Sequence, residues 1–110
     1  MSIPVLDPRA MHSLMKLGGK KKLDALMQMI KEHGPQRVKE LAEAGSLAEA
    51  KAAAAPLKTS ASHLGLAALE DLCDQVLEAQ HWAPGNPLPA QASAALKAGL
   101  AALDKERALL

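Results

Sequence analysis

The sequence predicts an all-α fold: an up-down antiparallel four-helix bundle with a short extra helix at the N-terminus. Residues that favour helices dominate the composition, while tyrosine and phenylalanine, which favour strands, are absent. Apolar residues recur every three or four positions through several segments, which is the spacing of one helix face. The connections between the middle segments are short, and short connections join antiparallel neighbours in a bundle.

The length and the charge of the chain limit its class. A chain of 110 residues is one domain by length, so we expect residues 1–110 to form a single helical bundle. The 13 basic and 12 acidic side chains give a net charge of +1, which argues against nucleic acid as a partner. The basic run at residues 20–22 is interpreted as a solvated helix start, with contact to an anionic partner as the alternative.

Membrane and secretion signals are missing from the sequence. No apolar stretch approaches the roughly 20 residues that span a bilayer, and the N-terminus lacks the apolar segment of a signal peptide. A single cysteine, Cys73, excludes a disulfide framework within the chain. We therefore expect a cytoplasmic protein with no membrane partner, and we also expect a monomer.

The first predicted helix is short. An Asp-Pro pair at residues 7–8 supplies a cap and a suitable first helical residue, and the Gly-Gly pair at residues 18–19 ends the helix. A second helix is expected over residues 20–45, with an apolar face that keeps its phase past Pro35. Proline removes a hydrogen-bond donor and crowds the preceding turn, so Pro35 is expected to kink this helix or to split it.

The third predicted helix begins after Ser46, which with Glu49 has the spacing of a capping box. Its apolar face repeats in steps of three and four residues and forms a narrow seam suited to closely packed helices. The seam consists of Leu47, Ala50, Ala54, Leu57, Ala61 and Leu64. Pro56 lies in the middle of this helix, where we expect a local bend.

The last two predicted helices are separated by a proline-rich loop at residues 83–89. The fourth helix follows Gly65 and ends close to Trp82, and the last helix begins at about Ala90. Cys73 falls on the apolar face of the fourth helix and is expected to be buried. Trp82 is the one aromatic residue; it is expected to pack under the proline loop, with a partner-binding anchor as the alternative.

One polar stripe flanks the seam of the third helix. Ala55 follows the seam residue Ala54 by one position, or about 100° around the helix, so it flanks the core instead of facing it. Apart from this alanine the stripe is polar and partly cationic, and we interpret it as a partner-binding surface. Its members are Lys51, Ala55, Lys58, Thr59 and Ser62.

The sequence carries no signature of an enzyme, a metal site or a cofactor site. The four histidines, at positions 12, 33, 63 and 81, include no pair at the spacing with which one helix face binds a metal. A glycine-rich phosphate loop and a G-x-S-x-G motif are missing too. We expect no metal, no cofactor and no catalytic residue.

Three segments carry a resemblance to a known family. Residues 54–65 read AAPLKTSASHLG, residues 69–73 read LEDLC, and residues 5–19 contain the short first helix and its LGG ending. These segments resemble the histidine-containing phosphotransfer (HPt) domain family, whose active-site helix has the pattern A-H-x-L-K-G-S-x-x-x-L-G followed by L-x-x-L-C. The resemblance spans nearly the whole chain.

The resemblance implies a phosphotransfer site that has lost its acceptor. In the family an exposed histidine accepts a phosphoryl group from a receiver-domain aspartate, and a lysine one turn away steadies the phosphoryl oxygens. Lys58 matches that lysine, but Ala55 stands in the place of the histidine, and a methyl group has no lone pair with which to attack phosphorus. Thr59 replaces a glycine of the family pattern and adds bulk on the same face.

The implied function is that of a non-catalytic pseudo-HPt protein in two-component or phosphorelay signalling. We expect it to bind a response-regulator receiver domain, a sensor histidine kinase or both, without phosphoryl transfer. Two alternatives stay open: an active HPt protein whose histidine at position 55 was changed to alanine by engineering, and a helical scaffold or oligomerisation module unrelated to phosphorelay. His33 and His63 are kept as surrogate acceptors, with a solvated or capping role as the alternative for each. A turn around Gly45 brings His33 near position 55, whereas His63 lies about 12 Å along the helix axis on a neighbouring face, where a receiver docked at Ala55 would miss it.

Overall fold

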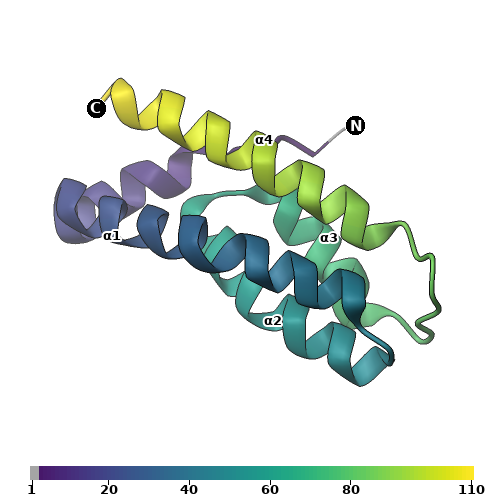
Figure 1. Ribbon diagram of the computed structural model, residues 1–110. Coiled ribbons are helices and arrows are strands. Elements are labelled where there is room, and N and C mark those ends of the chain that lie inside the picture. Colours follow the sequence, from purple (N-terminus) through teal and green to yellow (C-terminus); the bar gives the residue numbers. More distant parts are fainter. Residues whose placement is uncertain (1–2) are drawn as a thin grey trace.

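Four helices form the structure, a computed structural model that describes residues 3–110. They are α1 (Pro8–Glu43), α2 (Leu47–Leu64), α3 (Ala67–Glu78) and α4 (Leu88–Ala108). No strand occurs in the described range, so the predicted all-α class is confirmed. The helices form a closed ring of contacts, because α1 packs on α2 and α4, and α3 also packs on α2 and α4 (Figure 1).

The predicted caps are present at the starts of α1 and α2. The carboxylate of Asp7 accepts a hydrogen bond from the backbone N–H of Arg9 at 3.0 Å. At α2, the hydroxyl of Ser46 accepts from the N–H of Glu49 at 3.2 Å, while the Glu49 carboxylate accepts from the N–H of Gly45 at 2.7 Å. These bonds satisfy backbone donors that a helix start leaves without partners inside the helix.

A break at Gly19 divides α1 into two helical segments, as the Gly-Gly pair predicts. Gly19 has φ 71° and ψ −168°, a backbone conformation that is essentially restricted to glycine. The chain reverses its direction at this residue, and the reversal lies at one end of the molecule (Figure 1). The short N-terminal helix therefore spans residues 8–18.

Pro35 does not split α1, although the sequence left that outcome open. Gly19 is the residue of α1 with non-helical dihedral angles, and Pro35 lies inside the helix. The Pro35 side chain is exposed to solvent, where the carbonyl that loses its helical partner is able to bond to water. Pro56 is likewise contained within α2, which continues to Leu64.

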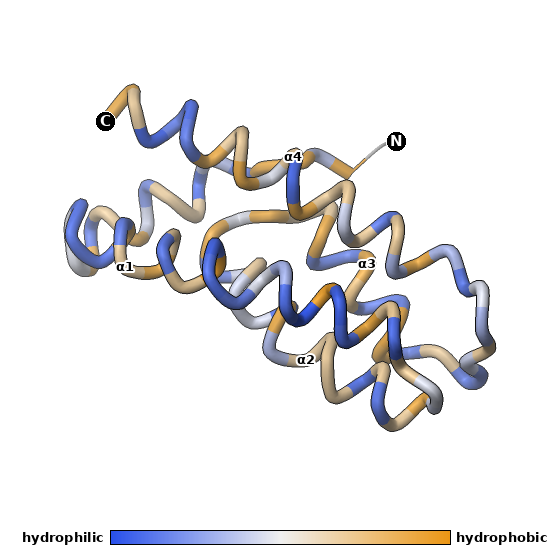
Figure 2. Tube along the Cα trace, viewed as in Figure 1, coloured by the Kyte–Doolittle hydropathy of each residue, from blue (hydrophilic) through white to orange (hydrophobic). Residues whose placement is uncertain are grey.

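The core is built from the apolar faces of all four helices, and no polar or charged residue of the described range is buried. Apolar residues recur along each helix in Figure 2. The α2 seam is buried from Ala50 to Leu64, while Leu47 at its start is only half-buried. Small residues allow close packing here: a methyl group added at Gly99 of α4 would approach a Leu66 methyl to 2.8 Å.

The C-terminal half differs from the prediction at two boundaries. α3 ends at Glu78, before the expected end near Trp82, and α4 begins at Leu88, two residues before the expected start at Ala90. Proline is tolerated in the first turn of a helix because its missing N–H would have no partner inside the helix, so Pro89 belongs to α4. The side chain of Asn86 accepts a hydrogen bond from the N–H of Leu88 at 2.9 Å.

Trp82 ties the loop after α3 to the end of α1. Its side chain is half-buried against the core, and its indole N–H donates a hydrogen bond to the backbone oxygen of Ala44 at 3.3 Å. The ring thus has a structural role in this protein. Within residues 3–110, no helix has the length and apolar character needed to cross a membrane.

Candidate functional site

Ala55 lies on the solvent-facing side of α2, next to a fully buried neighbour. Ala54 has 0% of its surface exposed, whereas Ala55 is exposed. The other members of the predicted stripe share this side of the helix: Thr59 and Ser62 are exposed, and Lys51 and Lys58 are half-buried. The structure therefore brings all five residues, from here on called the α2 stripe, onto one accessible face.

Lys58 is engaged by α3. Its ammonium nitrogen lies 2.6 Å from a carboxylate oxygen of Asp74. The hydrogen bond and the charge of Asp74 raise the pKa of Lys58, and the charges of Glu70 and Glu78 raise it further. Lys58 is thus held as a cation, but its charge is already compensated by a carboxylate of the same protein.

Thr59 is engaged within α2. Its hydroxyl donates a hydrogen bond to the backbone oxygen of Ala55, one turn earlier, at 3.2 Å. This arrangement is common for threonine in helices, because the side chain reaches the carbonyl four residues before it. Two polar groups beside Ala55 are therefore used inside the protein. Lys51 forms no ion pair among the described residues.

The residue that the sequence interpretation missed is Asp74. Every charged residue of α3 is acidic, and the four are Glu70, Asp71, Asp74 and Glu78. Glu70, Asp74 and Glu78 follow one another at four-residue spacing, which places them on one face of α3. That spacing was visible in the sequence as an acidic face, but its position beside Lys58 depends on how α3 packs on α2.

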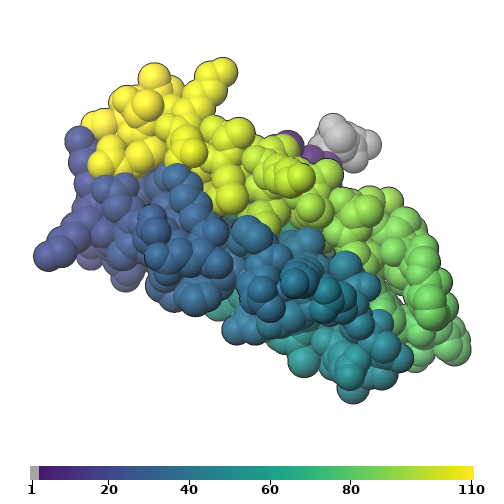
Figure 3. Space-filling view, viewed as in Figure 1, coloured from purple at the N-terminus to yellow at the C-terminus, as the bar shows by residue number. Residues whose placement is uncertain are grey.

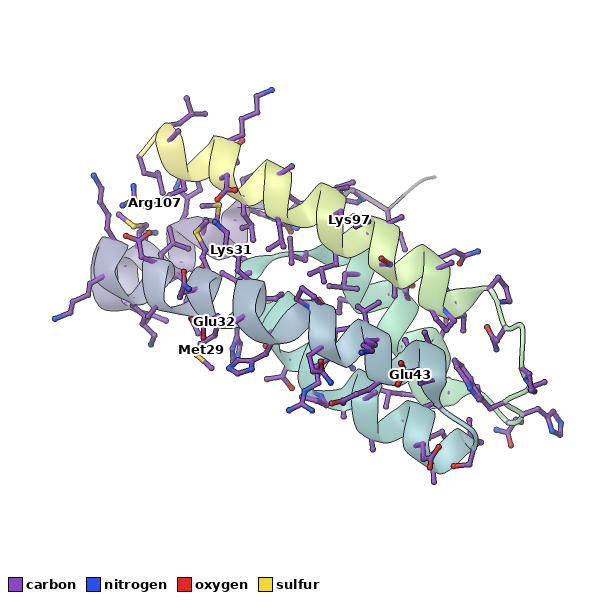
Figure 4. The ribbon with its side chains drawn as sticks, viewed as in Figure 1. Met29, Lys31, Glu32, Glu43, Lys97 and Arg107 are labelled. Atoms are coloured by element: carbon purple, nitrogen blue, oxygen red, sulfur yellow. The ribbon has the colours of Figure 1, made fainter. Side chains whose placement is uncertain are left out.

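A pocket of about 150 Å³ opens between α1 and α2 beside the stripe. His33 and Arg37 of α1 line it, together with Pro56 and Ser60 of α2. Met29 at its edge is 53% exposed and lies with Glu32 on the outer side of α1 (Figure 4). Apolar walls with polar groups at the rim suit the pocket for a side chain of another molecule.

The structure places the two surrogate histidines differently. His33 is exposed and lines the same pocket as Pro56, the residue that follows Ala55. His63 is also exposed, but it belongs to the last turn of α2, two turns beyond Ala55. His33 thus borders the same pocket as the residue that follows Ala55, whereas His63 is not among the residues that line it.

Ala55 offers no atom that accepts a phosphoryl group. The thiol of Cys73 is not a substitute nucleophile, because it is buried and burial raises its pKa to about 12. Among residues 3–110, no three His, Cys, Asp or Glu side chains are grouped so as to hold a metal ion.

Comparisons with protein-family models, with curated proteins and with solved structures found no match to this chain. Two features of the chain bear on its function: the geometry of the α2 stripe and the motif resemblance of residues 54–65 and 69–73. Both concern the same helix and its contact with α3.

Proposed function

We propose that this protein is a non-catalytic pseudo-HPt protein of phosphorelay signalling. It binds a response-regulator receiver domain or a sensor histidine kinase through the α2 stripe and transfers no phosphoryl group. The observation that carries the proposal is the exposed methyl group of Ala55, one turn from Lys58, at the position where the resemblance expects a histidine. The buried neighbour Ala54 supports it, because the helix face that builds the core is intact.

The proposal includes the arrangement of the helices and the setting of the protein. The helices run up and down as an antiparallel four-helix bundle in a cytoplasmic monomer. Support comes from the closed ring of helix contacts and from the short connections at residues 44–46 and 65–66. Such short links favour antiparallel neighbours.

The bonds of Lys58 and Thr59 support binding without phosphoryl chemistry. A phosphoryl group requires a nucleophile to receive it and cations to hold its oxygens. Here Ala55 supplies no nucleophile, and Lys58 is paired with Asp74. The groups left for a partner are the Ala55 methyl, the Lys51 ammonium, the Ser62 hydroxyl and the adjoining pocket, so the stripe recognises the shape and polarity of a protein surface.

The binding face is tested with a panel of purified receiver domains and sensor-kinase dimerisation domains, measured by titration calorimetry. The variant K51E reverses one charge of the α2 stripe, and we expect it to weaken binding about tenfold or more, since opposed like charges across an interface cost several kcal/mol. The matched control is K97E, which makes the same change on the exposed side of α4, away from the stripe (Figure 4).

Equal effects of K51E and K97E would place the binding face elsewhere. A complete lack of binding across the panel would favour a helical scaffold. Circular dichroism of both variants checks that the helices are unchanged.

A further inference from the structure

The corner of α1 around Gly19 has a composition unlike the rest of the surface. This corner, residues 16–22, contains the four lysines Lys16, Lys20, Lys21 and Lys22, and it contains no acidic residue. All four lysine side chains are exposed, and none forms an ion pair among the described residues. Its segment projects at the left end of the molecule in Figure 3.

A large apolar side chain stands at the same corner. Leu17 has 76% of its surface exposed, and it directly precedes the Gly18-Gly19 pair. The hydrocarbon chain of Lys22 lies close to Gly18: a methyl group added there would meet the Lys22 Cδ at 2.5 Å. The reversal at Gly19 thus brings Lys22 against Gly18, the residue that follows the exposed Leu17.

Asp24, which follows the corner in the chain, and Asp104 of α4 are both paired with cations outside the corner. Asp24 is held by Arg107, whose Nε lies 2.7 Å from one carboxylate oxygen, and Asp104 is held by Lys31 at 2.7 Å. Figure 4 shows Lys31 and Arg107 at this end of the molecule. Both carboxylates are therefore paired with cations outside the corner, and neither forms an ion pair with a corner lysine.

We propose that the Gly19 corner binds the surface of an anionic lipid bilayer, with Leu17 inserted below the headgroups and the lysines at the phosphates. Clustered lysines are attracted to anionic lipid, and an exposed apolar side chain gains by leaving water. The exposed leucine favours a bilayer over nucleic acid, because phosphate contacts on nucleic acid need cations alone. This inference is independent of the proposed receiver-binding function, and it revises the expectation of no membrane partner, which concerned spanning segments.

Vesicle co-sedimentation of the full chain tests the proposal. We expect binding to vesicles of equal parts phosphatidylcholine and phosphatidylglycerol, no binding to phosphatidylcholine alone, and weakening as salt screens the charges. The triple variant K20Q/K21Q/K22Q should bind about a hundredfold more weakly, at roughly fivefold for each lysine. The variant Leu17→Ser should bind about tenfold more weakly.

The matched control removes three lysines outside the corner and so changes the net charge equally. It is K39Q/K51Q/K97Q, whose side chains lie on α1, α2 and α4. The control should bind the mixed vesicles as the unmodified protein does. Three results would each overturn the proposal: no binding to the mixed vesicles, equal losses in the two triple variants, or binding that is unchanged in Leu17→Ser, which would assign the lysines to another anionic partner such as nucleic acid.

Discussion

The ammonium nitrogen of Lys58 lies 2.6 Å from a carboxylate oxygen of Asp74, so the cation nearest to Ala55 on α2 is bound to α3. The threonine that follows, Thr59, bonds to the backbone oxygen of Ala55. The position at which the HPt resemblance expects phosphoryl chemistry thus has no acceptor atom, and Lys58, the lysine that matches the family pattern, is already paired.

Removal of the Asp74 carboxylate is expected to release Lys58. In Asp74→Asn, inorganic phosphate should bind at the α2 stripe about threefold to fivefold more tightly, since an exposed ion pair of this kind is a modest competitor. Amide chemical shifts of α2 during a phosphate titration measure the change. Asp71→Asn is the control, because it removes the same charge from α3 but Asp71 bonds to Gln75. An equal gain in phosphate affinity in both variants would show that the net charge of α3, and not the Lys58–Asp74 ion pair, controls phosphate binding.

Histidine is expected to be tolerated at position 55 and not at position 54. The Ala55 side chain is exposed, so Ala55→His should change the free energy of unfolding by less than about 0.5 kcal/mol. Ala54 is 0% exposed, and an imidazole there overpacks the core and buries a polar ring, at a cost of about 3 kcal/mol or more. Urea unfolding of the two variants measures the difference, and similar losses would contradict the assigned helix phase.

Gly65 and Gly85 both have a positive φ, so an alanine at each position distinguishes the cost of backbone strain from the cost of a packing clash. Gly65 has φ 75° and Gly85 has φ 85°. An added methyl at Gly65 would clash with the backbone oxygen of Asp7 and meet Ala10 at 2.8 Å, whereas nothing lies within 4 Å at Gly85. Gly85→Ala should cost about 1 kcal/mol from its dihedral angles, and Gly65→Ala should cost at least about 2 kcal/mol more from the displaced start of α1. Equal losses of stability in the thermal unfolding of the two variants would mean that the start of α1 does not pack against Gly65.

Acid is expected to weaken the contact between α1 and α4. The hydrogen bond from Arg107 lowers the pKa of Asp24 below its ordinary value of 3.8. A lowered carboxyl pKa stabilises the folded state above the unfolded pKa, and this contribution is lost as the pH falls through the folded pKa. The stability of Asp24→Asn should therefore depend less steeply on pH below about pH 4. Circular dichroism during acid unfolding measures this dependence. An unchanged acid profile would show that the pair does not couple to folding.

Local signals in the sequence were sufficient for much of the fold. The caps at Asp7 and Ser46, the break at Gly19 and the buried α2 seam each depend on residues within a few positions of one another. Such features follow from helix-end chemistry and from periodicity. The exposure of Ala55 followed in the same way, because helix phase alone separates it from Ala54.

Features that depend on packing between helices were not predictable in this way. The partner of Lys58 is 16 positions away on another helix, and no pattern along the chain selects Asp74 from the four acids of α3. The pocket beside His33 depends equally on how α1 lies against α2. The start of α4 was predicted two residues too late, because Pro89 is accepted in the first turn of this helix, where its missing donor costs no helical bond.

Following the phosphoryl group tests most directly whether this protein binds a receiver domain without accepting its phosphoryl group. Receiver domains labelled at their aspartate with radioactive acetyl phosphate are mixed with this protein, and both the complex and the position of the label are followed. We expect a complex in which the label stays on the receiver, and transfer only after Ala55→His. Label that moves onto the unmodified chain, at His33 or His63, would contradict this expectation.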